Sequence, residues 1–108
     1  MAAYSVHADV KVILQIPDAI TTFDDEIDGC ITSGDALIDK LLEPYEVTVP
    51  GSVPQVIEDA STFFAAWLFR RRRDPVGAEA FYAEGRKFLD AYVSDEEDIG
   101  AFRVVSDE

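Results

Sequence analysis

The segment from Asp24 to Leu42 places nearly all of its apolar residues on one side of a helix. At 100° per residue these positions fall within about 120° of arc, while Asp28, Asp35 and Lys40 face away. Asp24 can cap the start, and the acidic first turn suits the positive end of the helix dipole. The pattern predicts an amphipathic helix over 24–42 whose apolar side comprises Ile27, Cys30, Ile31, Gly34, Leu37, Ile38, Leu41 and Leu42.

Three further helices are expected. A short one runs from a Ser5 cap to Leu14, and a third begins near Ser52 and Pro54 and ends before Asp74-Pro75. The fourth runs from about Val76 to Val93, with a clean apolar side made of Phe81, Tyr82, Gly85, Phe88, Leu89 and Tyr92. Gly34 and Gly85 each lie within an apolar side, which indicates close approach between helices.

The fold class is therefore mainly α, a small four-helix bundle with one long loop between Pro44 and Val53. Within that loop Glu46 to Val49 favours a short β-strand. After the helical domain, residues 1–93, an acidic linker leads into a C-terminal tail over residues 94–108. The β-prone piece Ala101 to Val105 in this tail can pair as a strand with Glu46 to Val49 or with another chain.

The third helix ends in four consecutive arginines, Arg70 to Arg73, after a run rich in aromatic residues. A helical wheel predicts a buried side made of Ile57, Ala60, Phe63, Phe64, Trp67 and Leu68. Arg71 falls within this side and needs a carboxylate partner or the open end of the bundle. Arg72 and Arg73 point away from the core.

Phe69 lies opposite the predicted buried side, in line with Ala65 and Ala66. Small residues allow close approach, and Phe and Arg are favoured at interfaces, so this patch is a candidate contact with a subunit or partner. The alternative is a solvated last turn whose arginines complement the helix dipole. The candidate interface residues in this region are Ala65, Ala66, Phe69, Arg70, Arg71, Arg72 and Arg73.

The chain is strongly acidic, with 22 Asp and Glu against nine Lys and Arg and a formal net charge of -13. This balance disfavours free binding to nucleic acid, which needs a cationic surface. High salt would screen the self-repulsion, so a salt-loving host and an ordinary acidic cytoplasmic protein are both open readings. The single cysteine, Cys30, is expected in the core. No signal peptide or membrane span is expected.

Catalysis is not expected, because the chain offers one histidine, one cysteine and no glycine-rich loop. His7 lies in the first turn of a short helix, where a solvated or capping role is favoured. The acidic run of Asp24, Asp25, Glu26 and Asp28 lacks the glycine and the spacing of a calcium loop. No catalytic residue, metal or cofactor is therefore predicted.

The order of the segments resembles the small head-tail connector (adaptor) proteins of tailed phages and related viruses. The resemblance covers roughly residues 4–93 and rests on helix order and apolar pattern. It is carried by the opening segment from Tyr4 to Lys11, the capped helix with Ile27, Ile31, Ala36, Ile38 and Asp39, the loop with Val53-Pro54, the aromatic helix that ends in arginines, and the segment from Phe81 to Leu89.

The resemblance implies a structural virion protein, assembled in the host cytoplasm, that forms a homo-oligomeric ring of usually twelve subunits beneath the portal protein. Packaged DNA would pass through the lumen without sequence-specific binding, and the far side would meet the next connector or the tail protein. Family members often dock on the portal through a C-terminal segment. Carried onto this chain, that segment contains Phe102, Arg103, Val104 and Val105.

Two other function classes are open at this point. One is a nucleic-acid-binding regulator that uses Arg70 to Arg73, against which the net charge and the scatter of the arginines around the helix both speak. The other is an acidic DNA mimic or inhibitory partner, against which the spread of carboxylates over several helices speaks. The leading hypothesis is the connector subunit.

Overall fold

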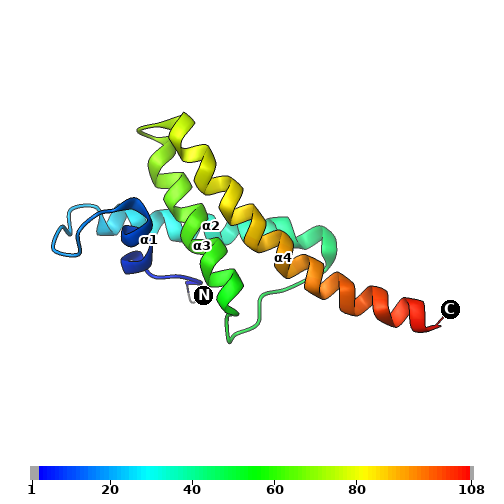
Figure 1. Cartoon of the computed structure of the whole chain (residues 1–108). Helices are drawn as coiled ribbons and strands as arrows, with labels where there is room; N and C mark the ends of the chain where they lie inside the picture. Colours follow the sequence, from blue (N-terminus) through cyan, green and yellow to red (C-terminus); the bar gives the residue numbers. More distant parts are fainter. Residues whose placement is uncertain (1–2, 108) are drawn as a thin grey trace.

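The computed structural model describes the backbone of residues 3–107 and the side chains of residues 3–94. Over that range the chain is mainly helical, and the prediction of a small four-helix bundle is confirmed (Figure 1). The elements are α1 (His7–Leu14), α2 (Asp24–Leu42), the short 3₁₀ helix η1 (Glu43–Tyr45), α3 (Gln55–Arg71) and α4 (Pro75–Asp107). The predicted bounds of α2 are those observed, but Asp24 does not cap it: Asp24 is the first residue of the helix, and the N-cap position is Phe23, which makes no side-chain capping hydrogen bond.

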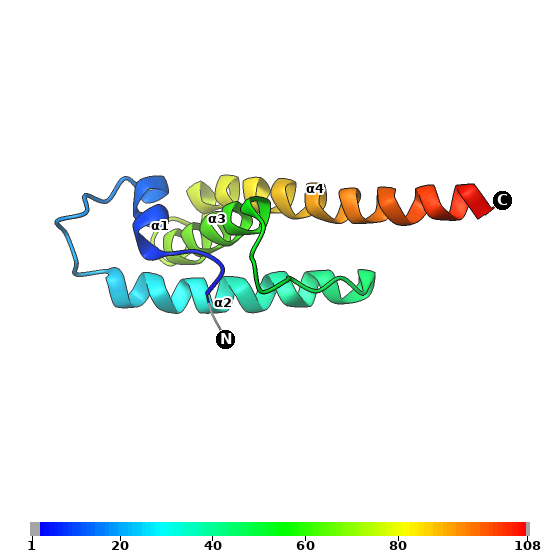
Figure 2. The same cartoon turned by 90° about the horizontal axis from the view of Figure 1, so that it is seen from below.

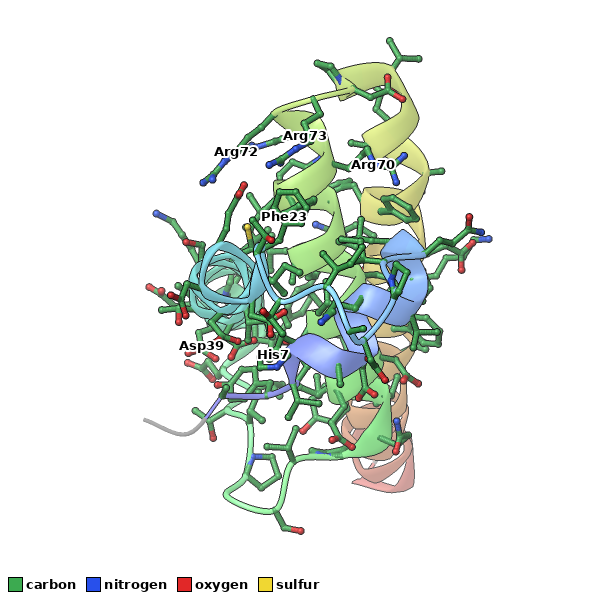
Figure 3. The ribbon with its side chains drawn as sticks, turned by 90° about the vertical axis from the view of Figure 1, so that its left-hand side faces the viewer. His7, Phe23, Asp39, Arg70, Arg72 and Arg73 are labelled. Atoms are coloured by element: carbon green, nitrogen blue, oxygen red, sulfur yellow. The ribbon has the colours of Figure 1, made fainter. Side chains whose placement is uncertain are left out.

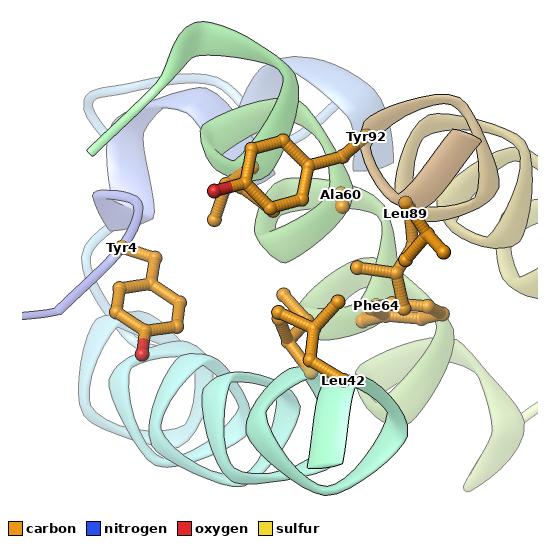
Figure 4. Packing of buried hydrophobic residues seen from close by; sticks show 9 residues of the cluster. Tyr4, Leu42, Ala60, Phe64, Leu89 and Tyr92 are labelled. Atoms are coloured by element: carbon orange, nitrogen blue, oxygen red, sulfur yellow. The ribbon is translucent and has the colours of Figure 1, made fainter. Parts of the chain in front are cut away.

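Helix α3 is the centre of the bundle. It packs against α1, α2 and α4, and Figure 2 shows it between α2 on one side and α4 on the other. One buried cluster lies toward the start of α3 and includes Ile38, Leu42, Ala60, Phe64 and Leu89 (Figure 4). A second cluster joins α1 and α2 to the later turns of α3 and includes the buried Cys30, as expected. A helix with neighbours on both sides buries two faces, which affects the site described below.

Phe64 fixes the spacing of three helices. Its side chain is fully buried, with Gly34 of α2 on one side and Gly85 of α4 on the other. A Cβ atom at Gly34 would lie 3.3 Å from Phe64 Cβ, and one at Gly85 would lie 2.8 Å from Phe64 Cε1. The close helix approach predicted at both glycines is therefore confirmed.

The N-terminal segment is held by a buried polar network, and this corrects two expectations. Ser5 does not cap α1, because the N-cap of α1 is Val6. The Oγ atom of Ser5 lies 2.6 Å from Ser61 Oγ instead. Asp35 does not face solvent but is 4% exposed. It accepts hydrogen bonds from Ser61 Oγ at 2.6 Å and from the Tyr4 backbone N–H at 2.8 Å. These contacts attach the segment before α1 to both α2 and α3.

Polar and charged side chains also connect α1 to the start of α2. His7 Nδ1 lies 2.9 Å from Asp28 Oδ1. The ammonium of Lys11, which is almost completely buried, lies 3.0 Å from Asp24 Oδ1 and donates to the Asp18 carbonyl at 3.1 Å. His7 thus has a structural role between two helices, which differs from the solvated or capping role expected for it.

Neither predicted strand forms in residues 3–107. The chain after α2 makes η1 and a left-handed residue, Glu46 (φ 57°), and then continues as irregular backbone to α3. Val47 and Val49 still pack against the core, which accounts for the apolar alternation there. The β-prone piece at 101–105 lies within α4, which runs without a break across the expected domain boundary at residue 94. Local helix continuation therefore outweighs β-propensity in this segment.

The C-terminal part of α4 projects beyond the other helices, as both views show (Figures 1 and 2). The molecule is accordingly elongated, with extents of 56 × 29 × 19 Å. The first half of α4 packs on α3 through Leu89, Tyr92 and Val93, which are buried. The projecting half corresponds to residues 94–107, which were predicted to form a separate tail.

Candidate interaction surface

Arg70, Arg72 and Arg73 lie at the turn between α3 and α4, at one end of the molecule (Figure 3), and Arg71 is the last residue of α3 beside them. The chain turns here because Asp74 precedes Pro75, which disfavours a helical conformation at Asp74 and starts the next helix at its first position. Asp74 then caps α4, since its Oδ1 accepts from the Gly77 backbone N–H at 3.1 Å. The last turn of α3 therefore presents its basic residues at a fixed position.

Arg72 and Arg73 both bind Glu26, in the first turn of α2. Arg73 donates to Glu26 Oε1 through Nη2 and to Oε2 through Nη1, both at 3.1 Å, and Arg72 Nη1 adds a third hydrogen bond to Oε2 at 3.1 Å. The hydrogen bond from Arg73 is the main cause that holds the pKa of the Glu26 carboxyl below its usual range. Arg73 also donates to the Phe69 carbonyl at 3.0 Å, which satisfies a C-terminal group of α3.

The guanidinium groups of Arg70, Arg71 and Arg73 lie over aromatic rings. The Arg73 Cζ atom lies 4.0 Å from the Phe69 ring centroid and 5.5 Å from that of Phe23. Arg71 lies over Trp67 at 4.7 Å, and Arg70 lies over Phe81 at 5.6 Å. These distances are within the range of a cation–π interaction. Two of these rings, Trp67 and Phe69, come from the aromatic run that precedes the arginines in the sequence, and the other two come from separate segments.

The predicted outward patch at Phe69 is wrong. Phe69 is 4% exposed, and Ala65 and Ala66 are fully buried. This face of α3 packs against α1 and α2, and the Phe69 ring meets the Phe23 ring edge to face at 5.5 Å. The small residues do allow close approach, but within one chain. These three residues are therefore core residues in the monomer.

Arg71 shows the reverse error: it was predicted on the buried side of α3 and is exposed. The wheel placed it within the buried side of α3, yet it is exposed because it is the last residue of the helix and lies beyond the packed turns. The open end of the bundle, one of the two solutions expected for its charge, is the one observed. With Arg72, whose side chain is 62% exposed, it forms the accessible part of the cluster.

The proposed docking residues of the tail fall outside the described side chains. Phe102, Arg103, Val104 and Val105 lie in α4 as backbone, and nothing further is described for them. A docking mode through this segment would therefore present a helix, whereas the sequence favoured a strand.

A second surface, which the sequence reasoning missed, is a groove between α1 and the first half of α3. It has a volume of about 300 Å³ and is lined by Asp9, Val12, Ile13, Gln55, Glu58, Asp59, Thr62 and Phe63. Val12 is 72% exposed there, although it lies in the middle of a helix. The sequence did contain a signal for this groove. The apolar residues of α1 are spread too widely around the helix to be buried on a single side.

The structure offers no arrangement typical of a metal site or a membrane span in the part of the chain that it describes. Within that part, no three His, Cys, Asp or Glu side chains are grouped as metal ligands would be. Likewise, none of the described helices combines the length and the apolar character needed to cross a bilayer.

Comparisons with protein-family models, with curated proteins and with solved structures gave no match for this chain.

The ion pairs of Glu26 with Arg72 and Arg73 predict that the stability of the protein depends on pH. We expect Glu26→Gln to lower the free energy of unfolding by about 1 kcal/mol or less at neutral pH, because the pair is partly exposed. The pKa of Glu26 is lower in the folded state than in the unfolded state, so its stabilisation is present above the usual carboxyl range and is lost as the pH falls through the lowered value. Urea unfolding of both proteins, followed by the fluorescence of Trp67, measures this difference at each pH.

Glu84→Gln is the matched control for this prediction. Glu84 pairs with Lys87 one turn away on an exposed face of α4, so its loss should cost only a few tenths of a kcal/mol. A Glu26→Gln effect that persists unchanged in acid, or that does not exceed the Glu84→Gln effect, would contradict the role given to Glu26.

Proposed function

We propose that this chain is a structural subunit of a viral head-tail connector, without a catalytic role. In this proposal it forms a ring, usually of twelve copies, beneath the portal protein, and its other side meets the next connector or the tail protein. The support is the helix order described for residues 4–93 together with a helical bundle of the expected kind. The virion is accordingly its proposed location.

The observation that carries this proposal is the projection of α4 beyond the bundle. A helical segment with no neighbours is marginally stable in water, because packing supplies most of the stability of helices in proteins. A projecting C-terminal half therefore suits a protein that functions in an assembly, where another chain covers it. The portal protein is the partner that the resemblance supplies.

The tail segment would then dock as a helix. An amphipathic helix can lay its apolar residues in a groove of the partner, whereas the strand pairing expected from the sequence needs an extended segment. Phe102, Val104 and Val105 are the apolar residues available for this contact. The acidic character of the chain suits a lumen through which DNA slides without adhering.

The alternative of an acidic regulatory or nucleic-acid-associated protein has less support. Arg73 makes two hydrogen bonds with Glu26 and Arg70 lies over the Phe81 ring, so half of the cluster is engaged within the chain and only the exposed Arg71 and Arg72 present an accessible charge. Phosphate contacts would have to compete with these interactions against a net charge of -13.

Electron microscopy tests the proposed function directly. We expect particles of the virus that encodes the chain to contain it as a ring with a central channel at the portal vertex. Phe102→Asp combined with Val105→Asp should abolish incorporation of the ring while leaving thermal unfolding of the purified protein unchanged. Ser94→Asp combined with Ser106→Asp, which adds the same two negative charges at polar positions, should be incorporated normally. Absence of the wild-type chain from intact particles would refute the proposal.

A further inference from the structure

One end of the molecule carries an exposed surface that is both basic and apolar. Arg71 and Arg72 are exposed at the end of α3, and Val76, in the first turn of α4, is 82% exposed. We call these three residues the turn surface. Glu26 neutralises part of the cluster, but four arginines outnumber the carboxylates of Glu26 and Asp74 beside them. The turn surface is therefore cationic within a strongly acidic chain.

The α1–α3 groove has the complementary character. Asp9, Glu58 and Asp59 supply three carboxylates on its lining, and Val12, Ile13 and Phe63 supply its apolar part. No lysine or arginine is among the lining residues. Val12 and Val76 are also the two most exposed of the large hydrophobic residues in the described part of the chain. Each surface thus contains an unusually exposed valine. The turn surface is positively charged and the groove is negatively charged.

The two surfaces cannot meet within one molecule. Asp59 and Arg71 lie on the same straight helix, twelve residues apart, which corresponds to about 18 Å along its axis. Figure 3 shows the arginines at the end of the α3–α4 pair, while His7 marks α1 nearer its middle. Two different surfaces that match each other but lie apart on a rigid body are the requirement for a head-to-tail contact between copies.

We propose that the turn surface of one copy docks in the α1–α3 groove of a second copy of this chain. Val76 would cover Val12, and Arg71 and Arg72 would approach Asp9 and Asp59. The choice of a second copy rests on the charge complementarity of the two surfaces and on the self-assembly contained in the proposed function. Because the contact is heterologous, it leaves one free surface at each end, and repetition closes a ring or extends a filament.

The net charge predicts an unusual salt dependence for this contact. Each copy carries a charge of -13, so two copies repel one another over a distance set by the Debye length. That length is about 30 Å at 0.01 M salt and about 8 Å at 0.15 M, so physiological salt screens the repulsion between whole molecules but not the pairs in direct contact. Self-association should therefore be weaker at 0.01 M than at 0.15 M salt.

Two complementary variants test the contact in the full-length protein. The turn variant carries Arg71→Gln, Arg72→Gln and Val76→Asn, and it keeps Arg73 to hold Glu26. We expect sedimentation velocity in 0.15 M salt to show that its self-association is weakened at least about tenfold, a change of about 1.4 kcal/mol.

The groove variant carries Asp9→Asn, Val12→Asn and Asp59→Asn, and the same loss is expected. Mixing the two variants leaves one intact turn surface and one intact groove, so they should form a dimer of one copy each and nothing larger. Wild-type chains should form longer assemblies under the same conditions.

Ile20→Asn is the control, because Ile20 is 43% exposed but belongs to neither surface. It should associate like the wild type. Variants that both associate normally, or a mixture that forms no heterodimer while the wild type associates, overturn the proposed contact. A wild type that stays monomeric up to about 1 mM overturns it as well. If viral particles contain a ring of this chain, the proposed function holds even when the proposed contact is refuted. If the chain self-associates as described but forms no ring in particles, the contact holds and the proposed function is refuted.

Discussion

Phe64→Ala is expected to lower the free energy of unfolding by about 3–5 kcal/mol, the usual range for removing a buried aromatic ring. Phe64 is fully buried at the point where α2, α3 and α4 meet (Figure 4). Its ring also contacts that of Tyr82, with centroids 5.6 Å apart. The cavity would be bordered by two glycines, which have no side chains to fill it. Chemical denaturation, followed by the fluorescence of Trp67, measures the loss.

Gly85→Ala provides a sharper test of the same contact. In the wild type the new Cβ would lie 2.8 Å from the Phe64 ring, so the variant should be destabilised by about 1–3 kcal/mol through overpacking. In the Phe64→Ala background the ring is gone, and alanine should instead stabilise α4 by about 1 kcal/mol through its helix propensity.

Gly29→Ala is the matched control for that double-mutant cycle. A Cβ at Gly29, which lies within α2, would meet nothing within 4 Å, so the substitution should stabilise both backgrounds equally. If Gly85→Ala has the same effect with and without the Phe64 ring, the proposed steric contact does not set the spacing of α3 and α4.

The sequence predicted the features that depend on one helix at a time. The bounds of α2 follow from a regular apolar spacing and an acidic first turn, both of which are local. Gly34 and Gly85 could be interpreted correctly because a glycine within an apolar side has few roles other than close packing. The end of α3 followed from Asp74-Pro75, whose effect on the backbone is independent of the rest of the fold.

The error at Phe69 came from assuming that a helix buries one side. A wheel finds the strongest apolar side of α3, but this helix is central and buries a second face against α1 and α2. A usable signal was present, since residues 60–69 contain no charged side chain at all. A helix that is uncharged on every side belongs in the interior.

The role of Asp35 could not be predicted, because its partners come from distant segments. The wheel placed it at the polar side of α2, where an aspartate is ordinarily solvated. The path of residues 4–5 brings the Tyr4 N–H to it, and the packing of α3 on α2 brings the Ser61 hydroxyl, and no local pattern encodes either contact. The groove of α1 and α3 was missed for the same reason, since its lining comes from two separated segments.

Asp35→Ala is the second substitution for which we expect a large effect, a loss of about 2–4 kcal/mol. It removes the acceptor of two buried donors, the Tyr4 N–H at 2.8 Å and Ser61 Oγ at 2.6 Å. An unsatisfied buried donor costs about 1–3 kcal/mol. The segment before α1 should also lose protection against amide exchange, which measures its attachment separately from global stability.

Asp35→Asn separates the hydrogen bonds from the charge. Its amide oxygen can accept from Tyr4, and its NH₂ group can donate to Ser61 Oγ, whose hydroxyl can then turn toward Ser5 Oγ at 2.6 Å. The Tyr4 N–H and the Ser61 hydroxyl keep a partner, but the buried Ser5 hydroxyl can then no longer donate to Ser61, so we expect a loss of about 1–2 kcal/mol at neutral pH, smaller than that of Asp35→Ala. A loss as large as that of Asp35→Ala would show that the carboxylate charge itself is required.

The same pair of proteins gives a pH signature. Burial raises the pKa of Asp35 despite the two hydrogen bonds that it accepts, and the nearby Asp39 carboxylate acts in the same direction. The folded state therefore binds a proton more readily than the unfolded state, and wild-type stability gains from Asp35 as the pH falls through the raised pKa toward the unfolded value. Asparagine cannot titrate, so the stability difference between wild type and Asp35→Asn should shift toward the wild type in acid. A difference that stays constant across the carboxyl range would mean that Asp35 is hydrated in solution and that the N-terminal segment does not seal it from water.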